Sequence, residues 1–166
     1  MNKIFEFPNL IINPKYLLVF IIASFIGCTN EKESYNLKDL ELEFGIKSSV
    51  SRIDDNSIFF ENVEYGEKSR NKLDIHIPDL VSPKGLLIFF HGGAFIGGDK
   101  SDIFEEFLSS IFLKIIKKGI IIVSANYSFL DSESSKGVLT SLEDGENVIS
   151  FLEQNRKLLN FSIRDN

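Results

Sequence analysis

The sequence predicts an α/β fold in which two antiparallel strands precede a β-α-β-α succession, forming a three-layer α/β/α domain. The first observation is Lys72–Ile77, where apolar and polar residues alternate as they do in a strand with one buried face. The second is Leu86–Phe90, five consecutive large apolar residues typical of a parallel strand covered on both faces. The third is an apolar stripe at helical spacing between residues 104 and 115, followed by a second buried strand that opens with Ile120–Val123.

The composition is that of a globular domain. The chain has 166 residues, of which 43% are hydrophobic and 25% charged, so it can bury a core and is not a disordered protein. Its formal net charge is −6, without a basic cluster. This balance argues against nucleic acids and anionic membrane surfaces as partners.

The amino terminus contains an uncharged apolar run, residues 16–27, preceded by Lys15 and followed by Cys28. Twelve residues are too few to cross a bilayer but suit the apolar region of a signal peptide. The residues around Cys28 resemble the lipobox of bacterial lipoproteins, in which the cysteine carries lipid after cleavage. We therefore expect a signal peptide (residues 1–27), lipidation of Cys28, and an exported protein at the outer membrane or cell surface, with a periplasmic location as the alternative. A secretory signal with an incidental cysteine, or an amino-terminal membrane anchor, also fits.

The segment 28–57 is polar, and we expect a solvated tether with one short helix around residues 37–44. The globular domain would then comprise residues 58–166. Its first strand is predicted over Ile58 to Tyr65. In the next strand the alternation puts Asp74 and His76 on the polar face, so we expect His76 to be a surface residue.

The strand Leu86–Phe90 leads into the glycine-rich turn His91-Gly92-Gly93-Ala94, followed by Gly98-Asp99-Lys100-Ser101. Adjacent glycines allow the backbone to approach a ligand and to direct N–H groups at an anion. The turn resembles the His-Gly-Gly-Gly oxyanion motif of α/β-hydrolase esterases and lipases, and in particular bacterial carboxylesterases related to feruloyl esterases and hormone-sensitive lipase. The resemblance implies an oxyanion hole made by the backbone N–H groups of Gly92 and Gly93, with Ala94, and a loop shaped by His91. Ala94 replaces a frequent glycine and should be tolerated if its torsions are ordinary. A tight turn without a catalytic role is the alternative.

Local patterns predict the elements that follow. Asp99, Ser101 and Asp102 suit the start of the first helix, and Gly119 suits its end. Ser141 to Asp144 form a capping-box pattern before the last helix, where Gly145 is interpreted as a site of close packing against the sheet and Asp144 as structural. The loop from Ser128 to Gly137 lies where open α/β sheets bind ligands. The resembled family often has Tyr-Arg-Leu where this chain has Tyr127-Ser128-Phe129, which leaves the anchoring of this loop in doubt.

The sequence contains no Gly-x-Ser-x-Gly, and neither of its two histidines lies downstream of a possible nucleophile elbow. The resemblance covers residues 58–166 and implies the amino-terminal half of a hydrolase domain, truncated before the nucleophile strand. In the family's strand order, Leu86–Phe90 lies beside that absent strand, so we expect it to be an exposed, aggregation-prone edge.

The resemblance implies a carboxylic ester hydrolase that acts on small-molecule esters, with this chain inactive on its own. The alternatives are a non-catalytic, lipid-anchored binding or structural module, and half of an enzyme complemented by a second chain. The sequence has no His/Cys/Asp cluster at ligand spacing and no nucleotide-binding glycine loop, so we expect no metal and no cofactor.

Overall fold

The computed structural model describes residues 21–25, 35–79, 83–130 and 136–161. Cys28, the expected lipidation site, lies outside these residues. The strands are β1 (Ile21–Phe25), β2 (Ile58–Glu64), β3 (Lys72–Ile77), β4 (Gly85–Phe90) and β5 (Ile120–Ala125). The α-helices are α1 (Leu37–Phe44), α2 (Glu106–Ile116) and α3 (Val138–Gln154), and a short 3₁₀ helix spans Lys100–Phe104.

The strands form one mixed sheet in the order β1-β4-β5-β3-β2. β4 and β5 are parallel, with Leu87 opposite Ile122, and the other three pairings are antiparallel. The 3₁₀ helix and α2 connect the two parallel strands. This arrangement confirms the predicted succession of two antiparallel strands followed by β-α-β-α.

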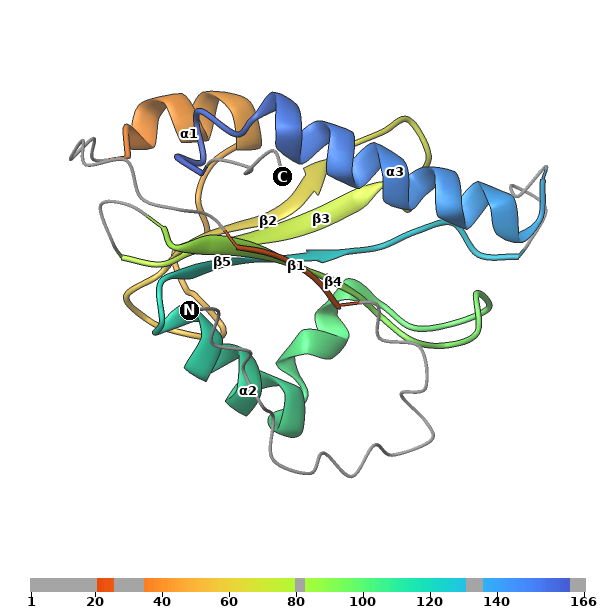
Figure 1. Cartoon of the computed structure of the whole chain (residues 1–166), viewed down its shortest axis with the longest axis horizontal. Helices are drawn as coiled ribbons and strands as arrows, with labels where there is room; N and C mark the ends of the chain where they lie inside the picture. Colours follow the sequence, from red (N-terminus) through yellow and green to blue (C-terminus); the bar gives the residue numbers. More distant parts are fainter. Residues whose placement is uncertain (1–20, 26–34, 80–82, 131–135, 162–166) are drawn as a thin grey trace, which may run out of the picture.

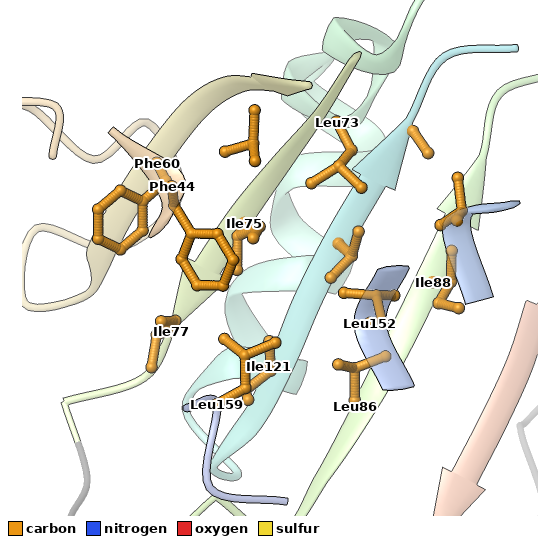
Figure 2. Close-up of a cluster of buried hydrophobic side chains, with 14 of the residues drawn as sticks. Phe44, Phe60, Leu73, Ile75, Ile77, Leu86, Ile88, Ile121, Leu152 and Leu159 are labelled. Carbon is orange, nitrogen blue, oxygen red and sulfur yellow. The ribbon is translucent and has the colours of Figure 1, made fainter. Parts of the chain in front are cut away.

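Helices cover both faces of the sheet, as the predicted three-layer fold requires (Figure 1). α1 and α3 lie on one face, and α2 lies on the other. On the α3 face, Leu152 and Leu159 pack with strand residues such as Ile75 and Ile121 (Figure 2). On the α2 face, a second cluster joins the strands to the helix and contains Ile53, Leu87, Phe89, Ile103, Leu108, Phe112, Ile116 and Ile122.

The segment expected to be a tether contributes to both cores. The helix predicted around residues 37–44 is present as α1, capped by the Asn36 side chain, which accepts a hydrogen bond from the N–H of Lys38. Its Leu40 and Phe44 are buried in the α3-side cluster, and Ile53 is buried on the opposite face. The segment 35–57 is therefore attached to the sheet through Leu40, Phe44 and Ile53, although side chains such as Leu42 and Ile46 remain exposed.

The prediction that His76 is a surface residue is wrong. The alternation along β3 is real, but the second face of the strand is covered too, and the exposed fraction of His76 is 0%. Its ring stacks on Phe59 with centroids 4.2 Å apart and meets Phe104 edge-on. Alternation identifies which residues share a face, but whether that face meets water depends on the helical layer above it.

β4 does not form the exposed edge expected from the sequence, because β1 pairs with it along its outer side. Residues 21–25 belong to the apolar run interpreted as part of a signal peptide. An extended segment without charges can satisfy the outward backbone groups of β4 as the neighbouring strand of the resembled fold would.

The helix starts differ in part from those predicted. Asp99 caps the 3₁₀ helix and forms a capping box with Asp102, and α2 begins two residues after that helix ends. The capping box predicted at Ser141 is wrong, because α3 begins at Val138 after Gly137. In the described part of the chain, no helix is both long and apolar enough to traverse a bilayer.

Candidate active-site loop

The loop after β4 is held in a conformation that only particular residues permit. Gly93 and Gly98 have φ angles of 111° and 95°, in the left-handed region that favours glycine. A Cβ on Gly93 would lie 2.1 Å from the carbonyl oxygen of Gly97, and one on Gly98 would lie 2.4 Å from His91 Nδ1. By contrast, a Cβ on Gly97 would have no neighbour within 4 Å. Two of the loop glycines are thus required by space as well as by torsion.

Ala94 does not meet the condition, ordinary torsions, under which it was expected to be tolerated. Its φ is 53°, and Phe95 follows with a φ of 64°. A left-handed conformation costs an L-residue with a side chain about 1–2 kcal/mol. The frequent glycine of the resembled motif would adopt it without strain, so Ala94 is tolerated at an energetic cost that the surrounding contacts must offset.

The peptide groups of the loop have a defined direction. The carbonyl of Gly92 accepts from His91 Nδ1 at 2.7 Å, and the carbonyl of Gly93 accepts from the N–H of Ile96 at 3.0 Å. In a trans peptide the N–H points opposite to the C=O of the same unit. The N–H groups of Gly93 and Ala94 therefore point away from these partners, and neither finds an acceptor among the described residues.

His91 is buried and acts as a support for the loop. Because a carbonyl can only accept, Nδ1 carries the proton that it donates to Gly92, and Nε2 accepts from Arg70 Nη2 at 3.3 Å. The ring stacks on Tyr127 with centroids 4.4 Å apart, while the Tyr127 hydroxyl donates to the His91 carbonyl at 2.9 Å. Burial lowers the pKa of His91, with the Arg70 charge acting in the same direction. This neutral histidine, with both ring nitrogens engaged, fits the predicted shaping role.

Arg70 anchors the loop after β5, which the sequence left in doubt. Its Nε donates to the carbonyl of Tyr127 at 2.9 Å, and its Nη2 donates to the carbonyl of Gly98 at 3.1 Å. The guanidinium also lies 3.6 Å from the centroid of the Phe129 ring. One side chain from the β2–β3 turn thus ties together both loops. The sequence carries no local signal for this role, because Arg70 is distant from both loops along the chain.

The Gly98-Asp99-Lys100-Ser101 run has a structural explanation. Asp99 accepts from the N–H of Ser101 and from Asn126 Nδ2, which links the 3₁₀ helix to the end of β5. Lys100 is almost fully buried and its Nζ lies 2.7 Å from the carboxylate of Asp74, whose exposed fraction is 0%. This buried ion pair fixes the helix start against β3.

Asp144 is structural, as predicted. Its carboxylate pairs with Lys68 at 2.7 Å and accepts from the N–H of Ser128 at 2.8 Å. Ser141, which does not cap the helix, donates from its hydroxyl to the Ser128 carbonyl at 2.7 Å. Both residues therefore hold the loop after β5 onto α3.

A pocket of about 320 Å³ lies beside Ala94, between the end of β4 and α3. Gly145 lies here, and a Cβ on it would be 3.8 Å from the Phe90 ring, an ordinary contact. The predicted closeness of helix and sheet is present, although alanine would also fit. The lining is mainly apolar and consists of Phe90, His91, Ala94, Phe95, Tyr127, Ser141, Leu142, Gly145, Glu146 and Ile149.

The structure brings His91 and Ala94 together at this pocket, with Gly92 and Gly93 between them in the same loop. It places His76 on the opposite, α2-covered face of the sheet, between the rings of Phe59 and Phe104. Among the residues that the structure describes, no group of three or more His, Cys, Asp or Glu side chains could hold a metal ion. The candidate site is therefore a backbone-lined loop beside an apolar pocket.

The sheet, its helical layers and this loop define an α/β-hydrolase fold of the esterase-like kind. The chain belongs to the BD-FAE family, whose model matches residues 73–165. It is 29% identical over 112 residues to kynurenine formamidase from Danio rerio, a match covering 66% of this chain and 35% of that enzyme.

Two solved structures share the fold. A truncated form of a carbohydrate esterase from gut microbiota is 20% identical with a TM-score of 0.51, covering 63% of this chain and 35% of the other. A proposed thioesterase from Silicibacter sp. TM1040 is 23% identical with a TM-score of 0.50, and the match covers 62% of this chain and 35% of the other. The chain thus spans about a third of the length of each of these proteins.

Replacing Gly93 with alanine is expected to destabilise the loop by several kcal/mol, since a Cβ cannot lie 2.1 Å from a carbonyl oxygen. The matched variant is Gly97→Ala, whose Cβ enters open space and which should change the free energy of unfolding by less than about 0.5 kcal/mol. Urea unfolding of both variants measures the difference. Equal effects would show that the loop does not have the described conformation.

Arg70→Lys is expected to loosen both loops, because an ammonium cannot reproduce the fork that bonds Tyr127 and Gly98. We expect the free energy of unfolding to fall by about 1–3 kcal/mol. Amide exchange should become faster than in the native chain in residues 92–98 and 127–130, but not in β3. Arg52→Lys serves as the control, since Arg52 lies over the Phe104 ring on the opposite face of the sheet. Unchanged exchange in both loops of Arg70→Lys would contradict the anchoring role.

Proposed function

We propose that this chain provides the oxyanion-binding part of the active site of a carboxylic ester hydrolase. The observation that carries the proposal is the direction of the Gly93 and Ala94 N–H groups, which are turned away from His91 and Ile96 and have no acceptor among the described residues. Donors fixed in this way stabilise the negative oxygen that forms when a nucleophile attacks an acyl carbon. Membership of the BD-FAE family and the esterase-like fold support this assignment.

The surroundings favour a small ester substrate. Ala94 lines the apolar pocket, in which an acyl or alcohol group could be excluded from water while its carbonyl oxygen meets the loop. Gly92 contributes the carbonyl that fixes the loop, and its own N–H also has no acceptor among the described residues. His91 and Arg70 contribute by positioning the donors.

The nucleophile, the general base and the acid that orients it must come from elsewhere. The Nε2 of His91 is occupied by Arg70, and His76 is enclosed by aromatic rings, so neither histidine is placed to activate a nucleophile. We propose that these groups belong to the part of the relatives that this chain does not span. The chain alone should then hydrolyse 4-nitrophenyl acetate no faster than buffer.

A complemented enzyme is the second candidate. It is favoured by apolar side chains of α3 that remain exposed beside the pocket, among them Leu142 at 51% and Ile149 at 36%. A second polypeptide carrying the remaining strands would bury them. We also propose export and lipid anchoring at Cys28, on the sequence pattern alone.

The test is to read the DNA beyond codon 166 in all three frames and to express whatever continuous product it encodes. We expect a Gly-x-Ser-x-Gly segment and a later histidine, in frame or after one frameshift, and a product that hydrolyses short-chain 4-nitrophenyl esters. A product with such a segment but no esterase activity would overturn the proposal. Absence of hydrolase-like sequence would refute the single-chain version and leave the complemented one, which is tested by adding lysate fractions to the purified chain.

A further inference from the structure

The Tyr127 side chain contacts two successive peptide groups at the start of the loop after β4. Its hydroxyl donates to the carbonyl of His91 at 2.9 Å, and the same oxygen lies 3.5 Å from the carbonyl oxygen of Gly92. In a trans peptide the N–H points opposite to the C=O of the same unit. The N–H groups of Gly92 and Gly93 are therefore directed away from Tyr127. One hydroxyl faces the carbonyl side of both peptides.

The Tyr127 ring supports the same loop through His91. The two rings are stacked, with centroids 4.4 Å apart and an interplanar angle of 14°. His91 Nδ1 in turn donates to the carbonyl of Gly92 at 2.7 Å. Because the stacked ring fixes the plane of the imidazole, it also fixes the direction of this donor. The Gly92 carbonyl, and with it the Gly93 N–H, depends on Tyr127 through the ring as well as through the hydroxyl.

Tyr127 is itself held in place. Its exposed fraction is 7%, and its ring meets the rings of Phe95 and Phe129 edge-on. Its backbone carbonyl accepts from Arg70 Nε at 2.9 Å. Burial raises the pKa of the Tyr127 phenol, so the hydroxyl keeps the proton that it donates. A fixed donor thus faces the loop.

We propose that Tyr127 is a positioning residue for oxyanion binding, which holds the Gly93 N–H in the direction that the developing negative charge requires. This role rests on the proposed ester hydrolysis and adds to it a residue from outside the glycine motif. The Tyr127 hydroxyl contacts backbone carbonyls of the protein, so its loss would misalign a donor that acts in the transition state. Such a loss lowers kcat and leaves KM nearly unchanged.

The first experiment uses the 166-residue chain and needs no catalysis. Tyr127→Phe removes the hydroxyl and keeps the ring, and ¹⁵N relaxation measures the order parameters of the loop amides. We expect the values of Gly92 and Gly93 to fall from about 0.85, typical of a rigid backbone, towards about 0.6. The value of Ala94 should change less, because the carbonyl of its peptide accepts from the N–H of Ile96.

The matched control is Tyr35→Phe. The Tyr35 hydroxyl donates to the carbonyl of Leu159, which follows the carboxyl-terminal end of α3. This variant makes the same chemical change away from the loop and should leave the order parameters of Gly92 and Gly93 unaltered. Unaltered values in Tyr127→Phe would overturn the proposal. So would an equal fall throughout β4 and β5, which would make Tyr127 a general support of the fold.

The second experiment uses the esterase product that the proposed function calls for, with 4-nitrophenyl acetate as substrate. We expect Tyr127→Phe to lower kcat about five- to tenfold with little change in KM, and Tyr35→Phe to change neither. An active native product together with an equally active Tyr127→Phe variant would overturn the positioning role and leave the proposed function intact. An inactive native product would refute the proposed function, and the catalytic role of Tyr127 with it.

Discussion

Acidification from pH 7 to pH 4 is expected to lower the free energy of unfolding of this protein steeply. The substitution His76→Leu is expected to remove much of that decrease. Burial, followed by the charges of Arg52 and Lys100, lowers the pKa of His76 from 6.5 to about 3. Between these values the unfolded chain binds a proton on His76 that the folded chain does not. The free energy of unfolding therefore falls as the pH falls from about 6.5 towards 3, at about 1.4 kcal/mol per pH unit from this group.

The effect can be isolated by comparing the two proteins at each pH. Leucine has a similar volume, and it removes two ring nitrogens that have no partner among the described residues. Carboxylates and His91 contribute equally to both proteins, so the difference between their urea midpoints reports His76. We expect the free energy of unfolding of the variant to rise progressively, relative to that of the native chain, as the pH falls below 6.5. Parallel pH profiles would contradict the buried, neutral state of His76.

Lys100→Met is expected to lower the free energy of unfolding by about 3–5 kcal/mol at pH 7, because it leaves the Asp74 carboxylate buried without its cation. Burial raises the pKa of Asp74, and the Lys100 contact opposes that rise. Without Lys100 the carboxyl group takes up a proton more readily. The cost of the substitution should therefore shrink as the pH is lowered, which chemical denaturation at several pH values measures.

The matched control for this prediction is Lys136→Met. Lys136 pairs with Glu143 at 2.6 Å, but the two side chains are 59% and 45% exposed. An exposed ion pair contributes at most about 1 kcal/mol. Equal costs for the two substitutions would show that burial does not govern the Asp74–Lys100 pair.

Much of the fold could be predicted because its signals are local. The apolar run of β4, the alternation in β3 and the stripe of α2 each specify an element through side-chain periodicity. The glycine pattern likewise located the loop that contains Gly93. The short helix α1 was also predicted, although the burial of its Leu40 was not.

The features that sequence reasoning missed depend on contacts between distant segments. His76 is buried because α2 and the 3₁₀ helix cover a face that alternation marks only as polar. Arg70 holds the loop after β5 from a turn 57 residues away in the sequence. The left-handed torsion of Ala94 is imposed by the loop as a whole, since alanine itself disfavours it.

The most direct test of the oxyanion proposal is the structure of a phosphonate adduct. The product encoded by this gene and the DNA that follows it would be reacted with a 4-nitrophenyl phosphonate, which leaves a tetrahedral phosphoryl group on an activated serine. The account predicts that one phosphoryl oxygen lies about 2.7–3.1 Å from the backbone nitrogens of Gly93 and Ala94. A covalent adduct whose oxygens all lie away from this loop would contradict it.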